Sequence, residues 1–300
     1  MEYNCLDMKL EEKAIKLLAN SGYGTFGQPH FKYYDFRVAE LITAFARRTL
    51  LGLKEFLQEK GLEVIYGDTD SLFVKKDIVN DFDISAQAKS KFQVEFIKDK
   101  SWQVLVLLSK KEYFGLLENG GHVTKTIYGL RDDKPPYFNT VTSEIISKEF
   151  LQQDLTSSSL KERALEYVRS VFNSMSDKII LKDEVFIREQ LAWRSKISKS
   201  LSQYANGWQK HVFEEKLAES NNNLETMELD NPSGSIQPYW KIVHDGKGSK
   251  NVTIHPDRYT LDLYQFKKDL WTCFEPILEA YGFKEDELIK LRNKLVDNYL

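Results

Sequence analysis

The sequence predicts an α+β protein in which helices packed on an antiparallel sheet are followed by a mainly helical portion. Between about residues 62 and 128, short β-rich runs flank turn residues, which is typical of hairpins. From about residue 140 to 216 the apolar residues recur mainly with the period of a helix. The hydrophobic content of 42% and the aromatic content of 13% indicate a folded core. The change from the mixed α and β pattern to the mainly helical pattern is predicted near residue 129.

Two helices are expected first. Apolar residues at helical spacing predict a helix over about residues 8–21, which ends at Gly22 and the glycines that follow it. A second helix is predicted over about residues 34–60, and Gly61 is a plausible stop for it. One stripe of this second helix is expected to be buried, namely Val38, Leu41, Ile42, Phe45 and Leu53.

The remaining elements are expected in a simple order. A hairpin is predicted from the two β-rich runs at residues 62–66 and 71–75. The later predicted elements are a helix at 80–97, strands at 104–108, 113–117 and 123–128, helices within 140–216, a β insertion at 236–243 and 251–255, and helices at 264–281 and 284–298. The polar segment around residues 221–235 is expected to be a loop.

Composition bounds the class of protein. The formal net charge is only −3, so any nucleic-acid-binding surface must be local rather than a property of the whole chain. The two cysteines, Cys5 and Cys273, form neither a disulfide framework nor a metal-ligand cluster, which favours a reducing compartment. We find no apolar run long enough for a membrane span and a start too polar for a signal peptide, so we expect a cytoplasmic protein without a membrane partner.

The predicted hairpin carries two carboxylates. Asp68 and Asp70 are two positions apart, and at a hairpin tip both side chains can project past the sheet edge toward one point. Two close carboxylates repel each other, and a hard divalent cation such as Mg²⁺ or Mn²⁺ relieves that repulsion. No histidine or cysteine lies nearby to suggest zinc. Taken alone, Asp-Thr-Asp is more often an ordinary turn sequence.

The first helix carries a second candidate surface. Lys16, Asn20 and Tyr23 are spaced i, i+4 and i+7, so one helix face bears a cation, an amide and an aromatic ring. This face could hold a polyphosphate and pack on a base pair. An ordinary amphipathic helix with a solvated lysine face gives the same pattern.

Three motifs together resemble those of family B DNA polymerases. Lys16–Gly24 (KLLANSGYG) is similar to the KxxxNSxYG motif of the last fingers helix, and Tyr66–Ser71 (YGDTDS) to the palm motif. Lys110–Tyr113 (KKEY) is similar to the KKxY motif. In outline, Ile197–Tyr204 and Tyr259–Tyr264 resemble segments of the thumb. The order and spacing fit, and the resemblance spans nearly the whole chain.

The resemblance implies a domain organisation. Residues 1–28 would be the C-terminal end of the fingers, and residues 29–128 part of a palm with an antiparallel sheet and the DTD hairpin. Residues 129–300 would form a mainly helical thumb. The activity implied is template-directed DNA synthesis, with two-metal nucleotidyl transfer to a primer 3′-hydroxyl.

The same resemblance implies roles for the candidate residues. Asp70 would be the main ligand of a catalytic Mg²⁺ (or Mn²⁺), and Asp68 an ancillary one. Lys16 would contact the triphosphate of an incoming dNTP, Asn20 would lie beside the nucleotide, and Tyr23 would line the nascent base pair. The residues implied to bind primer-template DNA are Lys110, Lys111, Tyr113, Lys196, Lys199 and Tyr204.

A basic stretch supports a DNA-binding thumb independently of the resemblance. Residues 188–210 are rich in Arg and Lys, with Glu189 as the only acidic residue, and Trp193, Tyr204 and Trp208 are interleaved. Such a local stripe in an acidic protein suggests phosphate contact, although a solvated helix face gives a similar run.

The family also carries a second metal-binding aspartate upstream, in a DxxSLYPS-type motif that is absent from this sequence, as is an exonuclease domain. We therefore expect the small subunit of a split, archaeal-type polymerase, completed by a large N-terminal subunit that supplies both. Three rivals stay open at this point. The chain could be a non-catalytic DNA-binding or assembly subunit, a truncation of a single-chain polymerase, or a generic nucleotidyltransferase.

Overall fold

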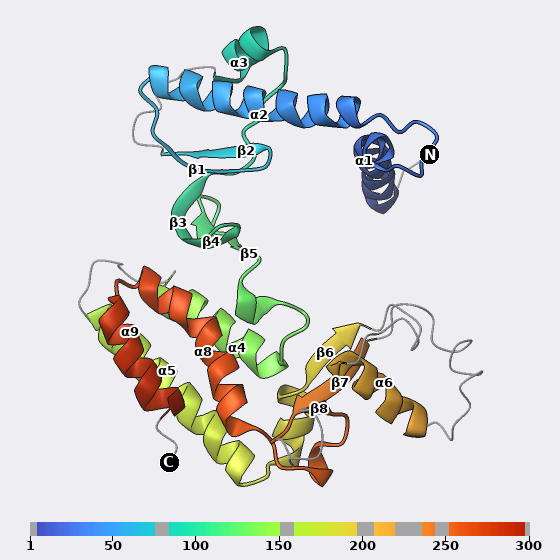
Figure 1. Cartoon of the computed structure of the whole chain (residues 1–300). Helices are drawn as coiled ribbons and strands as arrows, with labels where there is room; N and C mark the ends of the chain where they lie inside the picture. The colour runs from blue at the N-terminus through green and yellow to red at the C-terminus, as the bar shows by residue number, and fades with distance from the viewer. Residues whose placement is uncertain are drawn as a thin grey trace. The chain divides into compact units, whose positions relative to one another are not determined.

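Helices alternate with antiparallel strands in this 300-residue chain, so the α+β class predicted from the sequence is confirmed (Figure 1). The computed structural model describes residues 5–75, 84–150, 159–196, 207–219, 236–243 and 252–297. The chain divides into two compact units, Met1–Asp99 and Lys100–Leu300. This division lies upstream of the boundary that the sequence predicted near residue 129. The assignment of fingers, palm and thumb stays a prediction.

The small unit is built around one long helix. It contains α1 (Cys5–Gly27), α2 (Phe36–Glu59), the hairpin strands β1 (Val64–Asp68) and β2 (Ser71–Val74), and α3 (Ile84–Phe92). Helix α1 packs at the N-terminal end of α2, while the hairpin and α3 pack along its C-terminal half (Figure 1). Helix α2 is therefore the common support of every other described element in this unit.

Helix α1 is longer than predicted. The glycines at 22 and 24 were expected to end it near residue 21, but the helix continues to Gly27. Glycine inside a helix costs only about 1 kcal/mol relative to alanine, so it weakens a helix without forcing it to stop. The hydroxyls of Ser21 and Thr25 donate to carbonyls one turn back, at 2.8 and 2.7 Å, which satisfies these side chains within the helix.

The core of the small unit covers only one end of α2. Its buried side chains are Leu53, Phe56, Leu57, Leu62 and Ala88. The stripe predicted to be buried along the whole helix is buried at Leu53, but Leu41, Ile42 and Phe45 are 67%, 41% and 61% exposed. The prediction was wrong for these three residues, because α1 contacts the N-terminal end of α2 near Ala39 and no described element covers Leu41, Ile42 and Phe45.

The large unit begins with a sheet of three antiparallel strands in the order β3 (Trp102–Ser109), β4 (Glu112–Leu117) and β5 (His122–Lys125). These strands match the predicted β segments, although the last ends three residues early. Phe114 on β4 is fully buried and belongs to the large core rather than to the core of the small unit.

Helices supply most of the large core. They are α4 (Pro136–Glu144), α5 (Ser159–Ile180), α6 (Trp208–Glu219), α8 (Leu263–Ala280) and α9 (Glu285–Arg292). Aromatic side chains from three of these helices meet at its centre, where the rings of Phe172 and Phe274 lie 6.2 Å apart and Phe138 is fully buried. None of the helices in the described ranges is both long and apolar enough to cross a membrane.

A second three-stranded sheet packs beside these helices. Its order is β6 (Trp193–Lys196), β7 (Ile236–Lys241) and β8 (Val252–Thr253), all antiparallel. The last two strands were predicted as a β insertion, whereas β6 was expected to be helical. Its partner strand lies about forty residues away in the sequence, so local periodicity could not reveal it.

Two lysines join this sheet to the helices through one indole ring. The amino groups of Lys134 and Lys241 lie 5.0 and 4.2 Å from the ring centre of Trp193. Lys134 also lies 4.3 Å from the ring of Tyr128, and Lys241 forms an ion pair with Asp269 on α8. Burial, together with the charge of Asp269, raises the pKa of Tyr128 to about 12, so its hydroxyl stays protonated beside this cluster.

Gly129 makes a close approach that predicts a sensitive position. A Cβ added to Gly129 would lie 2.1 Å from Oγ1 and 2.9 Å from Cβ of the buried Thr142. We expect Gly129→Ala to destabilise the large unit by about 1–3 kcal/mol, because a β-branched buried neighbour cannot move away cheaply. Urea unfolding followed by tryptophan fluorescence measures this directly, since the five tryptophans fall at positions 102 to 271.

The matched control is Gly24→Ala, for which the added Cβ meets nothing within 4 Å. In the last turn of α1 this substitution is expected to leave stability unchanged or raise it by about 0.5–1 kcal/mol. Equal unfolding midpoints for Gly129→Ala and the unaltered chain would contradict the packing described here.

Candidate functional site

The tip of the β1–β2 hairpin is a tight turn between two carboxylates. Asp68 pairs with Ser71 across the hairpin, which leaves only Thr69 and Asp70 in the turn. The backbone N–H of Asp70 donates to the carbonyl of Asp68 at 2.6 Å, and Thr69 between them has a φ of 53°. This is the geometry of a γ-turn with positive φ at its centre, which is rare and strained for a β-branched residue.

The side chains at the tip are held by short local hydrogen bonds. The hydroxyl of Thr69 donates to Oδ1 of Asp68 at 3.0 Å, and that of Ser71 donates to the Asp68 carbonyl at 3.1 Å. The Asp68 residue is partly buried at the end of β1, whereas Asp70 is exposed in the turn. The tip therefore presents one anchored carboxylate and one that is open to solvent.

This donor set suits a hard cation but is incomplete by itself. Carboxylate oxygens are the protein ligands that Mg²⁺ prefers, usually one or two of them together with water and substrate phosphates. Within the residues that the structure describes, no group of three or more His, Cys, Asp or Glu side chains could hold a metal ion. The two aspartates fit a Mg²⁺ ion only if further oxygen ligands come from elsewhere.

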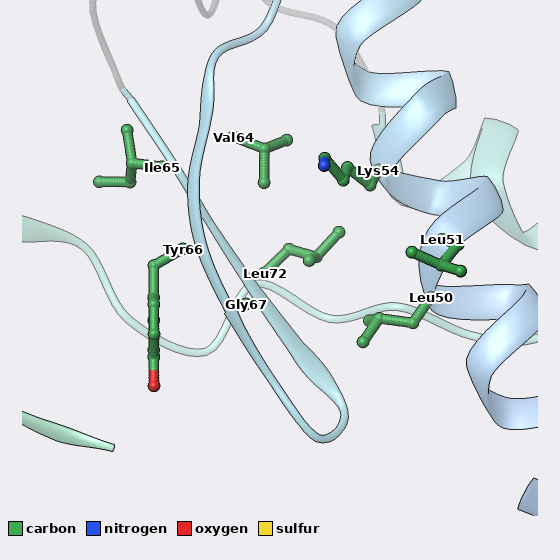
Figure 2. Close-up of a pocket in the computed structure, with 8 residues that line it drawn as sticks. All are labelled: Leu50, Leu51, Lys54, Val64, Ile65, Tyr66, Gly67 and Leu72. Carbon is green, nitrogen blue, oxygen red and sulfur yellow. The ribbon is translucent and has the colours of Figure 1, made fainter. Parts of the chain in front are cut away.

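Helix α2 fixes the direction of the hairpin. Val64, Leu72 and Val74 pack against the core that Leu53 and Phe56 form on α2. Figures 1 and 2 show the acidic tip directed along α2 toward the helix N-terminus, which is the end that carries α1. The hairpin is thus aimed at the part of the small unit where the second candidate surface lies.

A hollow of about 310 Å³ lies between the hairpin and α2 (Figure 2). Its lining is mainly apolar and comprises Leu50, Leu51, Lys54, Val64, Ile65, Tyr66, Gly67 and Leu72. Neither aspartate contributes to it. The hollow therefore belongs to the support of the hairpin and not to the acidic site.

The three candidate residues on α1 are all exposed. Lys16 and Asn20 face solvent, and Tyr23 is 48% exposed, so the helix presents these side chains rather than burying them. Their spacing places them on one face of a continuous helix. The structure brings this helix and the acidic hairpin together in one compact unit, with α2 joining them.

The candidate residues Lys110, Lys111 and Tyr113 lie in the large unit, at the turn between β3 and β4. Both lysines are exposed, and Lys111 has a φ of 70°. Its carbonyl accepts a hydrogen bond from the hydroxyl of Thr126. The ring of Tyr113 is partly buried and packs edge-on against Trp102, with the ring centres 5.9 Å apart. Neighbouring strands therefore fix the backbone of this turn, and both of its lysines lie on the surface.

The predicted thumb residues are described only in part. Lys196 ends β6 and pairs with Ile236 across the sheet, while Lys199 and Tyr204 lie outside the described residues. Trp193 was expected among the aromatics of a DNA-binding stripe, but it is 3% exposed and packs in the core. That expectation is corrected, because its ring is enclosed by Phe138, Tyr239 and the two lysines described above.

Sequence reasoning missed two residues that shape these surfaces. Thr69 was treated only as a spacer between the two aspartates. A β-branched residue at a hairpin tip is unusual, and that was the signal that could have drawn attention to it. Arg131 donates to Glu112 on β4 at 3.1 Å and lies 5.4 Å from the ring of Tyr128. It therefore ties the chain after β5 back to the turn that carries the lysine pair.

Comparisons with known proteins agree on one family. The model of DNA polymerase family B matches residues 4–230. DNA polymerase 1 of Aeropyrum pernix is 28% identical over 288 residues, which cover 94% of this chain and 28% of that protein. DNA polymerase 1 of Saccharolobus solfataricus is 28% identical over 283 residues, which cover 92% of this chain and 30% of that protein.

A solved structure gives the same result. The family B DNA polymerase from the hyperthermophilic archaeon Pyrobaculum calidifontis superimposes with a TM-score of 0.52 and 25% identity, over 96% of this chain and 33% of that one. The chain thus spans about a third or less of the length of these relatives.

Proposed function

The chain belongs to DNA polymerase family B, and from this premise we propose that it supplies part of the active site of a template-directed DNA polymerase. The observation that carries the proposal is the acidic tip of the β1–β2 hairpin, aimed along α2 toward the end that bears the Lys16–Tyr23 face. In this proposal the substrates are a dNTP and the 3′-hydroxyl of a primer paired with its template.

In this proposal Asp70 and Asp68 hold the cation, with Asp70 as the main ligand because it is the exposed one of the two. When bound there, Mg²⁺ supplies the positive charge that phosphoryl transfer needs at the attacking hydroxyl and at the leaving pyrophosphate. Thr69 donates to the Asp68 carboxylate and keeps it turned toward the tip. The Asp68 carboxylate is thereby oriented before substrate arrives, and such preorganisation is what electrostatic catalysis requires.

The α1 face binds the nucleotide in this proposal. The ammonium group of Lys16 neutralises the triphosphate, and Asn20 lies one turn further along the same face. Tyr23 packs on the nascent base pair and reads its shape rather than its sequence. Lys110, Lys111 and Tyr113, together with Lys196, Lys199 and Tyr204, contact the backbone of the primer-template.

The site requires a partner for completion. Its two carboxylates cannot hold two catalytic metal ions without a further acidic ligand, and none is grouped with them among the described residues. We propose that a large N-terminal subunit carries the missing aspartate and the exonuclease, and that the pair works in the cytoplasm.

Primer extension by the reconstituted pair tests the role of Asp70. We expect Asp70→Asn to lower the rate of nucleotide addition at least about a hundredfold, a barrier increase of about 3 kcal/mol, because the amide cannot replace an anionic ligand. Asp286→Asn on α9 is the control, since Asp286 makes only a loose exposed ion pair with Lys290 at 3.9 Å. Unchanged extension by Asp70→Asn would favour a non-catalytic assembly subunit.

The nucleotide face is tested by steady-state kinetics. Lys16→Ala is expected to raise the KM for dNTP about tenfold or more, which corresponds to the loss of about 1.4 kcal/mol of phosphate binding. Lys89→Ala serves as a matched control, because Lys89 is equally charged and its exposed partner is Glu95 at 3.4 Å. The assignment of the α1 face fails if both variants give the KM of the unaltered pair.

Thr69 is expected to act through Asp68 as a positioning residue. Thr69→Val keeps the branched Cβ but removes the hydroxyl that donates to Asp68, so the Mg²⁺ concentration giving half-maximal activity should rise several-fold. Thr69→Ser keeps the hydroxyl and should stay within about twofold of the unaltered pair. If Val and Ser behave alike in a Mg²⁺ titration, the hydrogen bond has no such role.

A further inference from the structure

One apolar stripe on α2 is buried at the C-terminal end of the helix and exposed to solvent toward the N-terminal end. Ile42, Phe45, Leu53 and Phe56 follow helical spacing and lie on one side of the helix. Leu53 and Phe56 are 5% and 6% exposed, whereas Ile42 and Phe45 are 41% and 61% exposed. The pattern in the sequence is that of a helix buried along its whole length, yet the described chain leaves Ile42 and Phe45 uncovered.

The helix that packs on this end of α2 also exposes large apolar side chains. Helix α1 packs on this end of α2, where Ala39 lies 3.9 Å from the position of a Cβ on Gly27. Three large apolar side chains of α1, Ile15, Leu17 and Leu18, are each at least 67% exposed. Isolated exposed apolar residues are ordinary, but a group on two packed helices marks an interaction site.

We propose that the exposed half of the α2 stripe, Ile42 and Phe45, together with the neighbouring exposed Leu41, is the docking surface for the large subunit that completes the polymerase. This inference rests on the proposed function. The match covers 33% of the length of the solved family B polymerase, so that protein contains a further body beyond the matched part. A partner that presents apolar side chains fits this surface, because burying a side chain such as phenylalanine contributes about 1.5–3 kcal/mol.

The chemistry of the surface favours protein over nucleic acid. Affinity for DNA comes mainly from positively charged side chains placed against phosphates. Leucine and phenylalanine side chains carry no charge. The surface also lies on the helix that carries the acidic hairpin, so a partner bound there would bring its own carboxylate near the tip that needs one. Binding of the partner to α2 would then also complete the metal site at the hairpin tip.

Binding of an upstream polypeptide from the same genome, one that carries the exonuclease and the missing aspartate, tests the proposal. We expect Phe45→Asp and, separately, Leu41→Asp to weaken binding at least tenfold in a titration by fluorescence anisotropy. Both side chains are more than half exposed, so the variants should fold, and circular dichroism with a thermal melt verifies that. Leu181→Asp is the matched control, because Leu181 is 80% exposed in the other unit.

The outcomes separate this surface from the proposed activity. Equal binding by Phe45→Asp and the unaltered chain would overturn the surface while leaving catalysis intact. Loss of binding in the variants, combined with no primer extension by the intact pair, would support the surface and refute the function. Failure of the unaltered chain to bind that polypeptide overturns the proposal, as does a homodimer of this chain that Phe45→Asp dissociates without affecting partner binding.

Discussion

The packing of the β1–β2 hairpin on α2 is the interaction on which the small unit depends. Two strands alone are marginally stable in water, so this hairpin persists through the side chains that it lays against Leu53, Phe56 and Leu57. The same contact sets where the acidic tip points and which end of α2 it approaches. A shift of one residue in the pairing would turn the apolar face outward and move both carboxylates, so stability and site geometry are linked.

In the proposed function, the tip supplies only part of a two-metal site. A single threonine separates Asp68 from Asp70, and the tight turn at Thr69 keeps these two residues together at the tip of the hairpin. A positive φ at Thr69 costs on the order of 1–3 kcal/mol, which the rest of the hairpin must offset. Strain of this kind concentrates at functional sites, and here it falls between the two aspartates that are proposed to hold the cation.

The sequence predicted the local elements well and the long-range contacts poorly. Helix α2, the hairpin and the Asp68–Asp70 pair follow from spacing and turn chemistry, which act over a few residues. The exposure of Phe45 and the burial of Trp193 depend on what lies opposite in space, and no local pattern records that. The left-handed backbone at Thr69 escaped prediction because β-branched residues normally avoid it.

The indole of Trp193, held between Lys134 and Lys241, has a consequence for handling the protein. Ring–cation contacts among partly dehydrated groups are screened by dissolved ions much less than an exposed pair such as Arg188–Asp257. The β6–β7 sheet should therefore stay packed against its helices at ionic strengths at which nucleic acids dissociate from proteins. A high-salt wash can thus strip contaminating nucleic acid from this chain without loosening the larger of its two units.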